Sequence, residues 1–111
     1  MTEITDIQMK SMMAAAKPYC VCILHATEKR KEPGAEKIVR EHARRNFQHK
    51  ADGVLPVVCP IADDTSIRGI GIYVGTMDEV ARLMDEDPSV LAGIFTYELH
   101  PCQSFPGSTL P

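Results

Sequence analysis

The chain has 111 residues, a formal net charge of −3 at pH 7 and a hydrophobic fraction of 44%. This length suits one domain, because two domains of half the size would each bury too little apolar surface. The acidic balance and the lack of a dense basic patch argue against a nucleic-acid partner. No apolar run approaches the roughly 18 residues that a membrane span requires.

Residues 1–17 are expected to form a loose or weakly helical extension, and residues 18–111 the folded domain with its C-terminal tail. Glu3 and Asp6 precede any apolar stretch. A secretory signal peptide has instead a basic start followed by a longer apolar core. The sequence therefore predicts a cytoplasmic location.

The four cysteines do not have the spacing of a zinc site; they are Cys20, Cys22, Cys59 and Cys102. Zinc sites usually use close pairs of ligands with two to four residues between them. Cys20 and Cys22 fall on one face of a predicted strand, where a free thiol behaves as a small buried hydrophobic group. We therefore expect buried thiols, no metal and no cofactor.

The first predicted strand, residues 19–26, is apolar on both faces and so must be covered on both. A charged loop follows at residues 27–33. A helix is predicted over residues 34–52, because its apolar residues recur at helical spacing; they are Ile38, Val39, Ala43 and Phe47. Gly53 is well placed to end this helix.

A second strand is predicted over residues 54–61, at a sheet edge because Pro56 and Pro60 lack backbone donors. The third strand, residues 67–74, alternates isoleucine and glycine, which indicates close packing on one face. Thr76 and Glu79 form a predicted capping box that begins the second helix.

The second helix is predicted to end at Asp87-Pro88, and a fourth strand is predicted over residues 92–100. The tail from residue 101 is rich in proline, glycine and serine. The order β-α-β-β-α-β predicts an α+β, ferredoxin-like subunit with two helices on one face of an antiparallel four-stranded sheet. A second copy packed sheet against sheet would cover the other face and form a homodimer.

A candidate site follows from this topology. Asp87, expected as the last residue of the second helix, would lie at the negative end of the helix dipole and need a cation nearby. His42 lies about two turns into the other predicted helix, and antiparallel packing brings it to the same end of the sheet. A carboxylate fixes the imidazole tautomer, so that the free nitrogen can take a proton near neutral pH.

Further candidates for ligand binding are expected at the same rim or beside this pair; they are His25, Arg40, Cys59, Pro60, Arg68 and Ser89. Arg40 or Arg68 would hold an anionic group. His49 and His100 are expected toward the opposite rim and are excluded.

No sequence context marks a nucleophile, since G-x-S-x-G and Cys-Gly motifs are lacking. Gly69 and Gly71 belong to a strand and lack the third glycine of a dinucleotide loop. Proton transfer therefore fits better than covalent catalysis. The plainer interpretations are that Asp87-Pro88 only stops a helix and that His42 is a surface residue. Likewise, Arg40, Arg44 and Arg45 would be solvated or paired with glutamates.

The run from Asp87 to Phe95 resembles the D-P-[FY]-x-x-[AN]-G-[VIL] signature of YciI-like proteins. His42, Gly53 and Pro60 match the spacing of that family's H-x10-G-x6-P pattern. The resemblance covers residues 17–101 and implies a dimeric α/β barrel of two ferredoxin-like subunits joined through their sheets. It also implies that His42 and Asp87 are the active-site pair, near a cleft.

Two residues depart from the family pattern. Cys59 replaces the usual glycine before Pro60, which narrows the pocket or adds a thiol to it. Ser89 replaces the usual aromatic residue, which widens it. A similar branch of the family eliminates chloride from chlorinated aromatic ring-cleavage or hydroxyquinol intermediates. The related muconolactone isomerases move protons on lactones.

These considerations predict a lyase, dehalogenase- or dehydrochlorinase-like, or an isomerase that transfers protons on a small cyclic or aromatic acid. The alternative is a non-catalytic module that binds a small ligand in the same cleft or accompanies other enzymes. A haem- or oxygen-handling monooxygenase is a third, weaker hypothesis, because haem requires an axial histidine in an apolar pocket. His42 is expected among charges.

Overall fold

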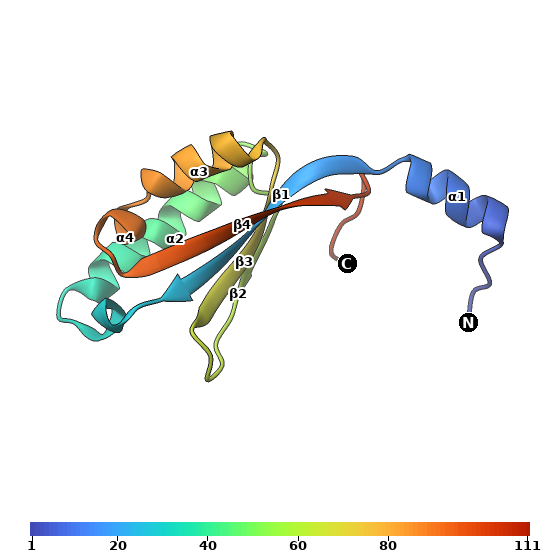
Figure 1. Cartoon of the computed structure of the whole chain (residues 1–111). Coiled ribbons are helices and arrows are strands. Elements are labelled where there is room, and N and C mark those ends of the chain that lie inside the picture. Colours follow the sequence, from blue (N-terminus) through green and yellow to red (C-terminus); the bar gives the residue numbers. More distant parts are fainter.

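The computed structural model describes residues 1–111 and contains one four-stranded antiparallel sheet with helices on one face (Figure 1). In chain order the elements are α1 (Asp6–Ala14), β1 (Lys17–Ala26), the 3-10 helix η1 (Glu28–Lys31), α2 (Ala35–Ala51), β2 (Val57–Pro60), β3 (Ile67–Tyr73), α3 (Met77–Asp85), α4 (Pro88–Leu91) and β4 (Phe95–Ser104). The strand order is β2-β3-β1-β4. The predicted ferredoxin-like α+β fold is confirmed.

The sheet has one face covered by the helices and one open face, and the side chains of β1 alternate between the two. Cys20, Cys22 and Leu24 point toward the helices and are buried, whereas Val21 and Ile23 between them lie on the other face and are half-buried. Side chains alternate across a strand, so this pattern follows from the register with β3 and β4. The covered face supplies the main core; its other buried hydrophobic residues are Ala35, Leu55, Tyr73, Val80, Met84, Ile94 and Phe95.

Helix α2 spans nearly the predicted range and ends as predicted. Asp52 is its C-terminal cap, and Gly53 follows with φ of 76°, in the left-handed region that favours glycine. The chain then turns back, and the amides of Val54 and Leu55 donate to the carbonyl of His49. Gly53 therefore directs the chain from α2 toward the sheet.

Strand β2 is an edge strand, as predicted, but it is shorter than the predicted 54–61. Leu55 precedes the strand and does not pair with β3; its side chain is buried in the core instead. A β-carbon on Gly71 would lie 2.9 Å from Leu55 Cδ1 and 3.2 Å from Tyr73 Cε2, so the expected close packing on β3 is found at Gly71. At Gly69 the nearest atom would be an ordinary 3.6 Å away.

Helix α3 begins at the predicted cap. The hydroxyl of Thr76 accepts a hydrogen bond from the amide of Glu79 at 3.2 Å. The Glu79 carboxylate bonds to the Thr76 hydroxyl rather than to the Thr76 amide, so only half of the predicted capping box forms.

The prediction that α3 ends at Asp87 and runs directly into a strand was wrong. Helix α3 ends at Asp85, Glu86 caps it, and Asp87 begins the short helix α4. Proline at the first position of a helix has a suitable φ, and aspartate is a favourable N-cap, so Asp87-Pro88 starts a helix here as well as separating two. Strand β4 consequently begins at Phe95 rather than residue 92, and continues to Ser104.

The N-terminal extension contains a regular helix. The Thr5 side chain and the Gln8 side chain form a reciprocal capping box at the start of α1, and no residue of α1 is buried. Figure 1 shows α1 apart from the sheet, beyond the start of β1 and the end of β4. None of the helices combines the length and the apolar character needed to span a membrane.

Candidate active site

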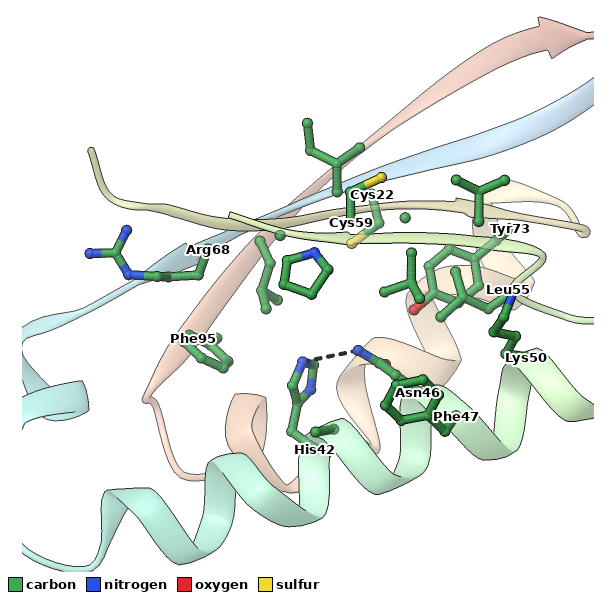
Figure 2. Close-up of a pocket in the computed structure, with 18 of the residues that line it drawn as sticks. Cys22, His42, Asn46, Phe47, Lys50, Leu55, Cys59, Arg68, Tyr73 and Phe95 are labelled. Carbon is green, nitrogen blue, oxygen red and sulfur yellow. Dashed lines mark hydrogen bonds between the residues drawn. The ribbon is translucent and has the colours of Figure 1, made fainter. Parts of the chain in front are cut away.

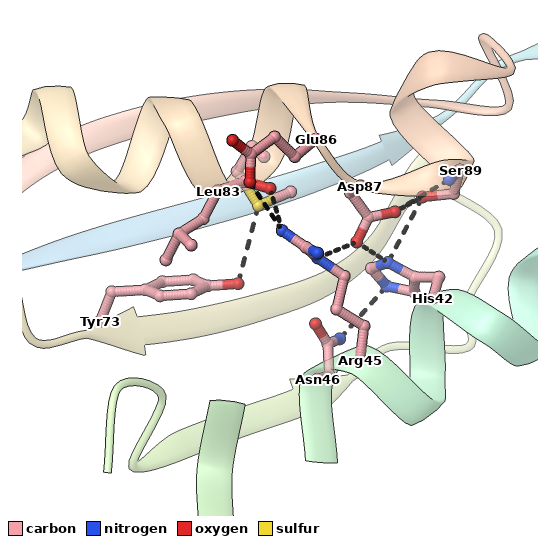
Figure 3. Close-up of polar contacts among 9 residues, drawn as sticks. His42, Arg45, Asn46, Tyr73, Leu83, Glu86, Asp87 and Ser89 are labelled. Carbon is pink, nitrogen blue, oxygen red and sulfur yellow. Dashed lines mark hydrogen bonds and ion pairs between the residues drawn. The ribbon is translucent and has the colours of Figure 1, made fainter. Parts of the chain in front are cut away.

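His42 and Asp87 meet beneath the sheet, although 45 residues separate them in the chain. His42 Nδ1 lies 2.8 Å from Asp87 Oδ2 (Figure 3). His42 is 8% exposed and Asp87 is 2% exposed. Packing of α2 beside α4 produces the contact that antiparallel packing of the helices predicted. The alternative that His42 is a solvated surface residue is wrong.

Asp87 is stabilised by its position as the N-cap of α4. Its Oδ1 accepts hydrogen bonds from the amide and the hydroxyl of Ser89. The predicted location at the negative end of a helix dipole is therefore wrong, because the carboxylate faces the amide end of a new helix turn. The guanidinium of Arg45, whose Nε is 3.9 Å from Oδ2, lies on the other side.

These contacts keep Asp87 ionised. Burial raises the pKa of the Asp87 carboxyl, but hydrogen bonds from His42 and Ser89 and the positive charge of protonated His42 outweigh burial, so the pKa is lowered below its usual value. An ionised carboxylate can only accept hydrogen bonds, so His42 Nδ1 carries a proton. In the neutral imidazole, Nε2 then holds the lone pair and can act as a base.

The free side of His42 faces a cavity of about 440 Å³ between α2 and strands β2 and β3 (Figure 2). Most of the lining residues are hydrophobic. The His42 ring packs edge-on against Phe95, with ring centroids 5.3 Å apart. The expectation that His42 lies among charges was wrong, because this side of the ring faces Phe95 and a mostly hydrophobic lining.

Three cations line the cavity, and no aspartate or glutamate does. Lys50 donates to the carbonyl of Pro56 at 3.1 Å, and Arg68 donates to the carbonyls of Thr65 and Ile67. Arg30 pairs with Glu36 at 2.8 Å. Neither Lys50 nor Arg68 forms an ion pair. Hydrogen bonds from Thr65 lower the pKa of the Asp63 carboxyl, and Arg68 is near enough to help lower it. The lining is therefore positively charged although the chain is acidic overall.

Three of the six predicted ligand-binding residues line the cavity; they are Cys59, Pro60 and Arg68. Ser89 is fully buried behind Asp87 and does not line it. Arg40 is exposed and lies outside the lining.

His25 lies on the open face of the sheet and not in the cavity. It follows Leu24, which points toward the helices, so the alternation of the strand turns His25 away from them. Its ring nitrogens contact Ser66 at 2.8 Å and Glu98 at 2.7 Å. The expectation that His25 reaches the rim of the His42 site is therefore not met. His49 and His100 also lie outside the lining.

Sequence reasoning missed Asn46 and Tyr73. Asn46 Nδ2 lies 3.2 Å from His42 Nε2, and Asn46 lines the cavity. It follows His42 by four residues, a spacing that places two side chains on one helix face and could have revealed it. The Tyr73 hydroxyl donates to Met84 Sδ at 3.6 Å, and burial raises the pKa of Tyr73 well above its usual value.

Comparison with known proteins yields a fold-level likeness. No family model matches the chain, and no curated protein matches it. One similar solved structure is the 5-chloro-2-hydroxyhydroquinone dehydrochlorinase TftG from Burkholderia phenoliruptrix, in complex with 2,5-dihydroxybenzoquinone. The sequence identity is 17%, the match covers 73% of this chain and 90% of that one, and the TM-score is 0.48. A likeness of this extent carries no argument about function.

Proposed function

We propose that this protein is a small-molecule lyase or isomerase in which His42 takes a proton from the substrate and Asp87 holds the imidazole in the required tautomer. The buried hydrogen bond of 2.8 Å between the two residues is the observation that supports this most strongly. Proton transfer by a positioned histidine needs no cofactor. The base faces a cavity large enough for a small cyclic compound.

The proposed substrate is a small cyclic or aromatic acid. The hydrophobic lining suits a ring, and Lys50 and Arg68, neither of which forms an ion pair, suit an anionic substituent. An isomerase would return the proton to another carbon of the ring. A lyase would instead expel a leaving group such as chloride from the neighbouring carbon.

The proposal includes membership of the YciI-like family. The supporting residues are the run from Asp87 to Phe95 and the spacing of His42, Gly53 and Pro60. Two glycines of these motifs have a structural reason in this chain, because Gly53 and Gly93 have φ of 76° and 72°.

The proposed partner is a second copy of this chain, packed on the open face of the sheet. Apolar side chains from β1 and β3 meet there across the ladder; they are Val21, Ile23 and Ile72. A sheet with apolar residues on both faces is stable in water only when both faces are covered. The opposite face already carries the helices.

Hydrogen–deuterium exchange into candidate substrates tests the proposed chemistry directly. The protein is incubated in D₂O with a panel of small cyclic and aromatic acids, and deuterium incorporation into carbon positions is followed by mass spectrometry. We expect exchange with the wild-type protein and a loss of about 100-fold or more in His42→Ala, because general-base catalysis typically contributes that much.

His100→Ala is the matched control, because this histidine is exposed and outside the cavity. It should exchange at the wild-type rate. Unchanged exchange in a folded His42→Ala variant would refute the role of His42. Acids that bind in a His42-dependent manner without any exchange would favour the alternative function, a non-catalytic ligand-binding module.

A further inference from the structure

Asn46 is the one uncharged amide side chain in the cavity, and it lies directly beside the proposed base. His42 and Asn46 are one turn apart on α2, and Figures 2 and 3 show the two side chains in contact with each other. The contact between Asn46 Nδ2 and His42 Nε2, 3.2 Å long, is the only hydrogen bond of the Asn46 side chain.

The geometry fixes which groups donate. Asp87 accepts from Nδ1, so Nε2 of the neutral imidazole is an acceptor and the amide of Asn46 donates to it. An amide nitrogen has two donor hydrogens, and only one is used in this contact. A proton arriving at Nε2 from a ligand must displace this donor, which then lies next to the atom that delivered the proton.

Arg45 Nε has no hydrogen-bond partner, but it lies 3.9 Å from Asp87 Oδ2 and Arg45 does not line the cavity. The remaining polar side chains near the base have partners. The hydroxyl of Tyr73 donates to Met84 Sδ, and Ser89 donates to Asp87 on the far side of the imidazole. Lys50 and Arg68 donate to backbone carbonyls of β2 and β3 and their flanking loops. Asn46 is the lining residue that directly contacts His42 Nε2, so it is the donor closest to charge that develops at the base, whereas Lys50 and Arg68 are left for a separate anionic substituent.

We propose that Asn46 donates a hydrogen bond to the substrate oxygen that becomes negatively charged when His42 removes a proton, so that the two residues act as a base and oxyanion-donor pair. This role rests on the proposed proton-transfer function and narrows the substrate class. The substrate carries its acidic C–H next to a carbonyl group, or is a phenol or enol whose O–H is itself acidic.

The bonds and charges balance with these two residues. The C–H bond breaks, the proton moves to His42 Nε2, and the electron pair forms a C=C bond while the carbonyl oxygen becomes an enolate. Asn46 donates to this oxygen, and the imidazolium remains paired with Asp87. In an isomerase, the carbonyl re-forms and His42 returns the proton to a carbon. In a lyase, the carbonyl re-forms as a leaving group departs from the adjacent carbon with its electron pair, and the imidazolium then releases its proton to solvent.

A neutral donor is suited to this task. Hydrogen bonds to a charged acceptor are about twice as strong as those between neutral groups, so an amide donor binds the enolate more tightly than the parent carbonyl. Only such differential binding accelerates the chemical step. A permanently positive residue at this place would also disfavour the imidazolium that His42 forms, because like charges repel.

Binding of 4-nitrophenol tests the pair, because its phenolate has a distinct absorbance and its oxygen mimics an enolate. The wild-type protein should shift bound 4-nitrophenol toward the phenolate. We expect Asn46→Ala to weaken phenolate binding about tenfold or more, which is the usual effect of losing a hydrogen bond to a charged group. Asn46→Asp should weaken it further, because its carboxylate repels the oxyanion.

4-Nitrotoluene, a neutral compound of the same shape, separates this role from packing, and both Asn46 variants should bind it as the wild type does. Gln48→Ala is the matched control, since this amide lies on the same helix but is exposed and outside the cavity. It should leave the binding of both compounds unchanged.

Unchanged phenolate binding in Asn46→Ala, or an equal loss for both compounds, would overturn the role of Asn46 while leaving that of His42 intact. Unchanged phenolate binding in His42→Gln would overturn the proposed function, and this role with it. The same conclusion would follow if the wild-type protein left the ionisation of 4-nitrophenol unchanged.

Discussion

The two faces of the sheet each carry a histidine–carboxylate pair with nearly the same distance but a different environment. On the covered face His42 and Asp87 are 2.8 Å apart, with side chains that are 10% and 3% exposed. On the open face His25 and Glu98 are 2.7 Å apart, with side chains that are 29% and 46% exposed. Glu98 also contacts His100 at 2.8 Å.

Burial, rather than distance, distinguishes the two pairs. Asp87 receives additional donors from Ser89, and its surroundings hold one tautomer of His42 beside an apolar cavity. Glu98 is shared between two histidines and reached by water, so the pairing is screened and can rearrange. The two histidine–carboxylate distances are nearly equal, yet only the His42–Asp87 pair on the covered face is suited to directed proton transfer.

The largest expected difference is in stability. Asp87→Ala leaves His42 and the Ser89 amide without their buried acceptor, and Arg45 without a nearby negative charge, and should cost about 3–5 kcal/mol of unfolding free energy. Glu98→Ala should cost far less, because its partners can turn to water. Urea unfolding of both variants at low protein concentration measures the difference. Equal losses would contradict the distinction between the two faces.

The pH dependence of stability should also differ. The folded-state pKa of Asp87 is lowered, so its contribution is present above the unfolded value of about 4 and is lost as the pH falls through the folded value. The difference in unfolding free energy between wild type and Asp87→Asn should therefore shrink when urea titrations are moved from pH 7 to below about pH 4. Hydrogen bonds from His100 and His25 also lower the pKa of Glu98, but its exposure makes the corresponding change for Glu98→Gln smaller. A constant difference for Asp87→Asn would contradict the assigned ionisation.

The two faces of the sheet should also differ in their role in assembly, since a second copy is proposed to cover the open face. Ile72→Lys places a charge among the apolar residues of that face and should convert a dimer to a monomer in sedimentation experiments. The His42–Asp87 pair lies on the other face, so 4-nitrophenol binding should be retained. Thr96→Lys, at an exposed position near the end of the same face, is the control. A wild-type protein that stays monomeric at high concentration would rule out the proposed partner.

Much of the fold could be predicted from the sequence because its signals are local. The period of apolar residues and Gly53 located α2, and the prolines placed β2 at an edge. The end of α3 could not be found in this way. Asp87-Pro88 is compatible with both the end of one helix and the start of another, and the side-chain bond to Ser89 decides between them.

The sequence by itself determined the order of the elements and hence that His42 and Asp87 could meet, because antiparallel packing of two helices follows from strand order. The tertiary structure alone decided what surrounds them. Asn46 and Phe95 at the ring of His42, Ser89 behind Asp87 and the cavity against β2 and β3 depend on how α2 and α4 pack on the sheet. Burial and hydrogen-bond partners are properties of that packing. They fix the tautomer of His42 and leave its Nε2 as the base.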